Sequence, residues 1–176
     1  MANSLDVTFD YLATTPNVAA LATLRAAAAS RHEPIWRRAV RALMRRSDYA
    51  GHLELLRSLD PMIPRWRAVV QNPPVPFIES LRQAIQEDDL EICRNACRIA
   101  VWAELFDFIP VLAARLEASM PPHRDLFGQT LMELSEMLAS RLTAPPDGQR
   151  GQALQWVVGQ IRNALEHQVS RFSSKT

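Results

Sequence analysis

Apolar side chains recur along most of the chain at the spacing of three to four residues that places them on one face of a helix. The stretch from Pro34 to Arg46 is the clearest example. Its apolar residues, Trp36 and Leu43 among them, fill one broad arc of a helical wheel, and its arginines fill the opposite arc. No segment alternates apolar and polar residues between Gly or Asn turns, as a sheet requires. The pattern predicts an all-α protein.

Prolines, more than glycines, separate the periodic segments. The chain has twelve prolines and five glycines, and the proline pairs lie between one periodic segment and the next. We expect a short helix or turn between Ser4 and Leu12, a side-chain cap from Asp48 on the helix that follows it, and a frayed tail over residues 171–176. The pattern predicts helices over residues 17–29, 34–46, 48–59, 63–71, 76–87, 89–102, 106–118, 123–142 and 148–171.

Two parts of the chain are visibly alike, and successive helix pairs begin roughly thirty residues apart. Residues 88–118 contain two groups of spaced positions, namely Asp89, Ile92, Arg94 and Ala96, then Pro110, Leu112 and Leu116. Residues 33–59 match them at Ile35, Arg37 and Ala39, whereas Glu33 replaces the aspartate and no proline precedes Leu53. This pattern resembles HEAT-type helical repeats, in which an Asp-x-x-Val-Arg-x-x-Ala helix is followed by a Pro-x-Leu-x-x-x-Leu helix, although Arg94 stands one position later than the arginine of the family pattern.

The resemblance implies one HEAT-like domain over residues 1–176, a short right-handed α-solenoid of stacked antiparallel helix pairs. A two-helix unit cannot bury its apolar stripe alone, so such units must stack on their neighbours. A nonrepeating helical bundle is the alternative, because the same periodicity allows it.

Composition and cysteine usage favour a cytoplasmic protein. Of the 176 residues, 48% are hydrophobic and 22% are charged, with a net charge of +1. No basic residue precedes the first apolar stretch, as a secretory signal would need, and the longest apolar run (residues 18–29) is too short to span a bilayer. Cys93 and Cys97 lie four residues apart on one predicted helix, so we expect both to stay reduced and to pack inside. The excess of arginine over lysine suggests a bacterial genome rich in GC.

The sequence predicts no catalytic, metal or cofactor site. The four histidines have no metal-ligand spacing, and no nucleophile motif occurs. The acidic residues from Glu87 to Glu91 are explained by a helix start, and the four tryptophans are expected to pack in the core. A non-enzymatic protein is therefore the favoured expectation. A small-molecule enzyme stays open, because helical clefts bind ligands without linear motifs.

An arginine stripe is the one surface feature with a candidate function. It consists of Arg37, Arg38, Arg41 and Arg45. Residues 1–70 carry ten arginines against six acidic residues, so this part of the chain is basic despite the near-zero total charge. The stripe has three interpretations: an ordinary solvated face, a surface for a partner protein, or a contact surface for phosphate groups.

The favoured function is a non-enzymatic interaction or scaffold module that presents a surface to a protein partner. The alternative is a nucleic-acid-binding protein or a relative of the DNA-repair glycosylases, because the alkylpurine DNA glycosylases are HEAT-like and cradle DNA on a basic surface. The resemblance to that branch is architectural, and no catalytic aspartate is matched. No membrane contact is expected, and the sequence specifies neither the partner nor the oligomeric state.

Overall fold

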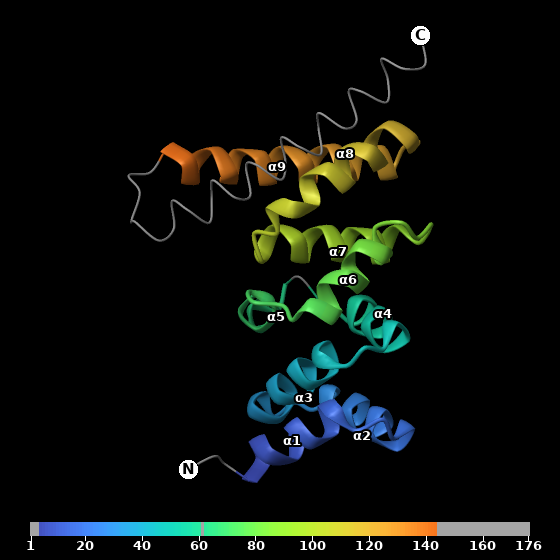
Figure 1. The fold of residues 1–176 in the computed structure, drawn as a ribbon, viewed down its shortest axis with the longest axis vertical. Helices are drawn as coiled ribbons and strands as arrows, with labels where there is room; N and C mark the ends of the chain where they lie inside the picture. Colours follow the sequence, from blue (N-terminus) through green and yellow to red (C-terminus); the bar gives the residue numbers. More distant parts are fainter. Residues whose placement is uncertain (1–3, 61, 144–176) are drawn as a thin grey trace. The chain divides into compact units, whose positions relative to one another are not determined.

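The computed structural model describes residues 4–60 and 62–143, and in these ranges it contains nine α-helices, one 3-10 helix and no strand (Figure 1). The predicted all-α class is confirmed, and each helix predicted before residue 143 has an observed counterpart. The helix predicted over 148–171 and the tail over 171–176 lie outside the described residues. The elements are α1 (Ser4–Thr14), α2 (Val18–Ala28), α3 (Glu33–Arg45), α4 (Tyr49–Arg57), α5 (Pro64–Val70), α6 (Val75–Ala84), α7 (Leu90–Trp102), η1 (Phe106–Phe108), α8 (Ile109–Ala118) and α9 (His123–Thr143).

The chain divides into two compact units, Met1–Ile99 and Ala100–Thr176. The first holds α1 to α6 and most of α7, and the second holds η1, α8 and α9. Each has buried apolar side chains of its own. The single domain and the solenoid arrangement that the repeat pattern implies stay predictions.

Helix α3 is the central element of the first unit, because it packs against α1, α2, α4, α5 and α6. Its apolar arc is buried from Trp36 to Met44, and Arg37, Arg41 and Arg45 on the opposite arc are exposed. The amphipathic pattern read from the sequence is therefore confirmed. The Trp36 ring packs edge-to-face on Trp66, with 5.1 Å between ring centroids.

Buried polar groups tie the neighbouring helices of this unit together. His52 of α4 lies against the backbone carbonyl of Leu43, 3.1 Å from Nε2, and against the Ser80 hydroxyl of α6, 2.6 Å from Nδ1. Because a carbonyl can only accept, Nε2 carries a proton, and the Ser80 hydroxyl beside Nδ1 also donates to the Pro76 carbonyl at 3.1 Å. The Asn95 side chain of α7 donates to the Leu56 carbonyl of α4 at 2.8 Å. These bonds satisfy groups that would otherwise cost free energy inside the core.

Cys93 and Cys97 are buried and form no disulfide, as their spacing predicts. The Cys93 thiol donates to the carbonyl of Ala84, the last residue of α6, at 3.4 Å, and to that of Glu87, just beyond this helix, at 3.1 Å. Packing is also confirmed for the tryptophans that the structure describes. Trp36 and Trp66 are buried and Trp102 is half-buried, whereas Trp156 lies outside the described residues.

The second unit is built on the pairing of α8 with α9, with η1 beside them. Phe108, Leu112, Phe127 and Leu134 are fully buried and form its core. An ion pair between Arg141 and Glu104 joins the end of α9 to the turn before η1. This unit therefore has a hydrophobic core of its own.

The expected side-chain cap on α4 is wrong. Asp48 does occupy the N-cap position, but its side chain makes no capping hydrogen bond. Its Oδ2 is instead buried over Gly51, and a Cβ atom added at Gly51 would lie 2.8 Å from that oxygen and 3.3 Å from Leu21 Cδ1. The close approach of α2 to α4 therefore depends on a residue without a side chain.

We expect Gly51→Ala to lower the stability of the first unit by about 1 kcal/mol. Overpacking typically costs about 1–3 kcal/mol, and the better helix propensity of alanine offsets part of that cost. Gly128→Ala is the matched control, because the atom nearest its added Cβ is 3.5 Å away, an ordinary contact. That variant should gain roughly 0.5–1 kcal/mol. Thermal melts followed by circular dichroism should shift in opposite directions, and equal shifts would contradict the tight contact.

A pH dependence follows from the buried histidine. Burial lowers the pKa of His52 below its ordinary value of 6.5, and the hydrogen bond to Leu43 and the charge of Asp48 oppose this only in part. The unfolded chain therefore binds a proton that the folded chain does not. The resulting stability is fully present above pH 6.5 and is lost as the pH falls below it. Urea midpoints should fall between about pH 7 and pH 5. In His52→Gln, which does not titrate, this fall should be smaller; an identical fall would exclude His52 as its source.

Candidate functional site

The four predicted arginines lie together on the solvent side of α3, and we call these residues the arginine face. Arg37, Arg41 and Arg45 are exposed, and Arg38 is half-buried. Residues three and four apart on a helix are neighbours, so Arg41 stands between Arg38 and Arg45. The four arginines therefore lie together on one face of α3, as the sequence pattern predicts. The contacts that these side chains make could not be read from the sequence.

Two of the arginines are held by the first helix of the chain. Arg38 Nε lies 2.5 Å from Asp6 Oδ1, and Arg45 Nη1 lies 2.5 Å from Asp10 Oδ1. The two aspartates are one turn apart on α1, so they present their carboxylates on the same side of that helix. Arg46, which follows α3, donates to the carbonyls of Leu12 and Thr15 at 2.6 and 2.9 Å. Its charge therefore lies at the carboxyl end of α1, where the helix dipole favours a cation.

Polar contacts supply much of what holds α1 in place. Ala13 is the one buried residue of this helix, and Val7 and Tyr11 are 59% and 69% exposed. An isolated helix of this length is marginal in water, so α1 depends on its contacts with α3. The two ion pairs are partly exposed, so each contributes at most about 1 kcal/mol, and salt weakens them.

The other two arginines differ in their partners. Arg37 forms an ion pair with Glu33 one turn earlier on the same helix. Within residues 4–60 and 62–143, Arg41 has neither an ion pair nor a side-chain hydrogen bond. Three carboxylates therefore face four guanidinium groups, and the uncompensated charge of the arginine face lies at Arg41.

A surface hollow opens beside Arg41. Its volume is about 300 Å³, near the lower end of the range for ligand pockets. We call it the Arg41 hollow, and its lining combines two arginines and one asparagine with apolar residues. The lining residues are Arg41, Met44, Arg45, Ala68, Val69, Asn72 and Pro74. Helix α3 therefore supplies both its charges, and α5 with the bend after it supplies the opposite wall.

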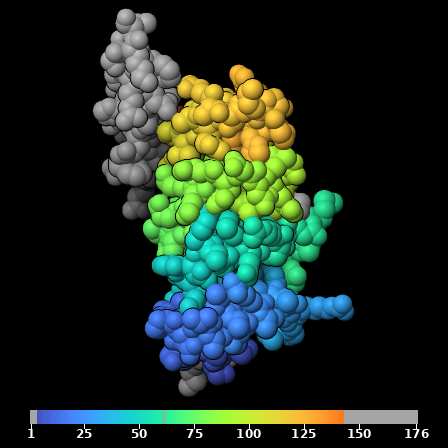
Figure 2. All heavy atoms as spheres, turned by 90° about the vertical axis from the view of Figure 1, so that its right-hand side faces the viewer, coloured from blue at the N-terminus to red at the C-terminus, as the bar shows by residue number. Residues whose placement is uncertain are grey.

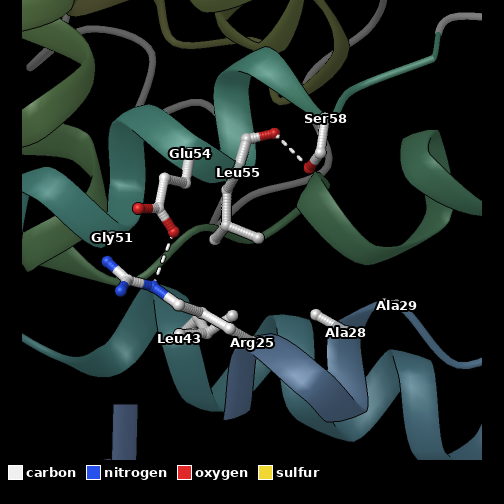
Figure 3. A pocket seen from close by; sticks show the side chains of 8 residues that line it. All are labelled: Arg25, Ala28, Ala29, Leu43, Gly51, Glu54, Leu55 and Ser58. Atoms are coloured by element: carbon white, nitrogen blue, oxygen red, sulfur yellow. Dashed lines mark hydrogen bonds and ion pairs between the residues drawn. The ribbon is translucent and has the colours of Figure 1, made fainter. Parts of the chain in front are cut away.

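A second, smaller hollow lies between α2 and α4 and has a volume of about 180 Å³. Arg25 and Glu54 reach toward each other at one side of it, and their Nε and Oε2 atoms are 2.5 Å apart (Figure 3). Ala28, Ala29 and Leu55 make its wall largely apolar. In the space-filling view the blue atoms of α2 and the teal atoms of α4 lie directly against each other (Figure 2). Arg25 and Glu54 neutralise each other in this ion pair, so the hollow presents no unpaired charged side chain to a ligand.

The groups with shifted pKa values serve the internal structure. The Tyr49 hydroxyl donates to Glu87 Oε1 at 2.7 Å, and burial together with that bond raises the pKa of Tyr49 well above its ordinary value. His52 is buried between Leu43 and Ser80. Neither residue lines a hollow described above, and no set of three His, Cys, Asp or Glu side chains in the described ranges is placed to hold a metal ion.

None of the helices in the described part of the chain combines the length and the apolar character needed to cross a lipid bilayer. Comparison with known proteins gives neither a matching family model nor a matching curated protein. In the described part of the chain, the arginine face and the hollow next to it are therefore the features from which a function can be inferred.

The sequence did not predict the part that α1 plays at this site. Asp6 and Asp10 were not candidates, because their partners lie 32 and 35 residues further along the chain. The only sequence signal is a pair of acidic residues four apart on a short helix that precedes a basic one. Such a pair is common on solvated helices and does not identify its partner.

We expect Asp6→Asn combined with Asp10→Asn to loosen α1. Removal of both ion pairs should cost about 0.5–2 kcal/mol, since each partly exposed pair contributes roughly 0.2–1 kcal/mol. Hydrogen exchange at the amides of residues 4–14 should speed up severalfold, and 0.5 M salt, at which the Debye length is about 4 Å, should have a similar effect on the native protein. Glu33→Gln removes an ion pair within α3 and should leave α1 unchanged. Unaltered exchange in the double variant would show that apolar contacts alone hold α1.

Proposed function

We propose that the chain is a non-enzymatic protein-interaction module that binds an acidic segment of a partner protein through the arginine face of α3. The observation that carries the proposal is the state of Arg41. Arg41 is exposed, has no ion pair or side-chain hydrogen bond to a described residue, and lines a hollow with a partly apolar wall. Arginine beside a partly apolar recess is a common anchor in protein interfaces.

The charge balance favours a protein partner over nucleic acid. A protein that binds duplex DNA typically neutralises several phosphates, about six to ten in strongly salt-dependent cases. Arg37, Arg38 and Arg45 are each engaged by a carboxylate of this chain, so the face offers about one uncompensated charge. A single guanidinium group next to an apolar recess suits one acidic side chain better than a run of phosphates.

The side chains around the Arg41 hollow favour binding over catalysis. Its wall contains arginine, asparagine and apolar residues. Proton transfer near neutral pH is usually carried out by His, Glu, Asp, Lys, Cys or Tyr, and none of these lines the hollow. The guanidinium group of an arginine carries several N–H donors and no acceptor, which suits the binding of anions.

The finer proposal is a HEAT-like solenoid that works in the cytoplasm of a bacterium. The burial of the apolar repeat positions supports the solenoid part of this proposal. Ile92, Ala96 and Leu112 are fully buried, as the HEAT pattern expects for its apolar positions, whereas the exposed Arg94 lies one position later than the arginine of that pattern. Such a stack would hold the arginine face rigidly, and a preformed surface loses less entropy on binding.

The test is a fluorescence anisotropy titration of the full chain with two labelled probes at low and physiological salt. One probe is a short peptide of alternating glutamate and leucine, and the other is a duplex DNA. We expect the peptide to bind at micromolar to submillimolar concentration, with DNA at least about ten times weaker at physiological salt. Tighter binding of DNA, with a steep salt dependence, would instead support the nucleic-acid alternative. Peptide binding that is absent even at low salt would overturn the proposal.

A further inference from the structure

Arg45 is shared by two sites. Its Nη1 atom pairs with Asp10 of α1 at 2.5 Å, and the same side chain lines the Arg41 hollow. Asp10 is itself well exposed, with 62% of its side chain accessible to solvent. A guanidinium group has five N–H donors, and Asp10 is bonded to those on Nη1; a carboxylate that binds Arg45 in the bidentate mode along the edge that carries Nη1 needs the same donors. Occupation of the hollow by an anion and docking of α1 therefore draw on the same group.

We propose that the Arg41 hollow binds a carboxylate of an acidic partner peptide between Arg41 and Arg45, and that Asp10 of α1 is its internal competitor. This inference rests on the proposed function and adds the ligand group, the residues that hold it and a means of regulation. The ligand carboxylate takes Arg45 from Asp10 when it binds. Helix α1 then loses one of its two ion pairs to α3.

The walls of the hollow define the rest of the ligand. Ala68 and Pro74, which keep exposed surface, and the edges of the largely buried Met44 and Val69 give an apolar lining that suits an aliphatic side chain next to the acidic one. Asn72 adds an amide that can donate to a carbonyl or carboxylate oxygen. The volume of about 300 Å³ accommodates one or two side chains, not a folded domain. The favoured ligand is therefore an extended or helical segment with an acidic residue beside a leucine, isoleucine or valine.

Competition makes binding and α1 docking reciprocal. If the ion pair of Asp10 lowers the affinity for the ligand by some factor, then the bound ligand lowers the equilibrium constant for docking of α1 by the same factor. The ion pair is partly exposed, so that factor is modest, roughly two- to five-fold. Conditions that loosen α1 should therefore raise the affinity for the ligand. Added salt is an exception, because it also screens the charges between the ligand and the arginines.

The experiment measures the affinity of the labelled glutamate–leucine peptide for the full chain and for four variants at constant salt. Arg41→Gln should weaken binding about ten-fold or more, because it removes a charge-assisted bond. Asp10→Asn should tighten binding two- to five-fold. Arg57→Gln and Asp88→Asn make the same changes of charge on exposed residues outside the hollow, and each should alter the affinity by less than about two-fold. Circular dichroism melts verify that the variants are folded.

The outcomes separate this inference from the proposed function. If the peptide does not bind the native chain, the proposed function fails and this site fails with it. If the peptide binds but Arg41→Gln and Arg57→Gln weaken it equally, the interaction function stands and the hollow is not the site. If Arg41→Gln acts as expected while Asp10→Asn and Asp88→Asn tighten binding equally, the hollow is the site and Asp10 does not compete for it.

Discussion

The ion pairs between α1 and α3 set how much of the arginine face a partner can reach. Asp6 and Asp10 occupy Arg38 and Arg45, and Arg46 holds the carboxyl end of α1. The chain therefore neutralises most of its own basic face with a helix that buries little apolar surface. What stays open is Arg41 and the hollow beside it. Because the carboxylates of α1 already pair with this face, carboxylates are the groups that the face is suited to bind.

The position of α3 explains why this face can be both rigid and accessible. Its apolar arc is locked in the core by Trp36, Val40 and Leu43, so the opposite arc cannot turn away from solvent. Buried hydrogen bonds at His52 and Asn95 fix the helices that pack around it. The arginines therefore project from a backbone that packing holds in place, while α1 is attached mainly at the surface. Arg45 therefore lies where the firmly packed α3 contacts the more weakly attached α1.

The sequence predicted the helices because their apolar spacing is a local property. The arc of α3, the proline boundaries and the burial of Cys93 could all be read from neighbouring residues. The Arg41 hollow could not, because Arg41 and Asn72 are brought together by the packing of α5 against α3. The pairing of Asp10 with Arg45 likewise depends on the fold. The missing cap at Asp48 has a similar origin, since the close approach of α2 at Gly51 leaves its carboxylate over the helix backbone.

A double-mutant cycle on Asp10 and Arg45 tests the central claim, that these two residues and the ligand share one guanidinium group. Peptide affinity would be measured for the native chain, Asp10→Asn, Arg45→Gln and the double variant at one salt concentration. The account predicts that Asp10→Asn tightens binding when Arg45 is present and has no effect when Arg45 is replaced, which is a non-additive cycle. Equal tightening in both backgrounds would mean that Asp10 acts only through its general negative charge, and it would contradict the shared role of Arg45.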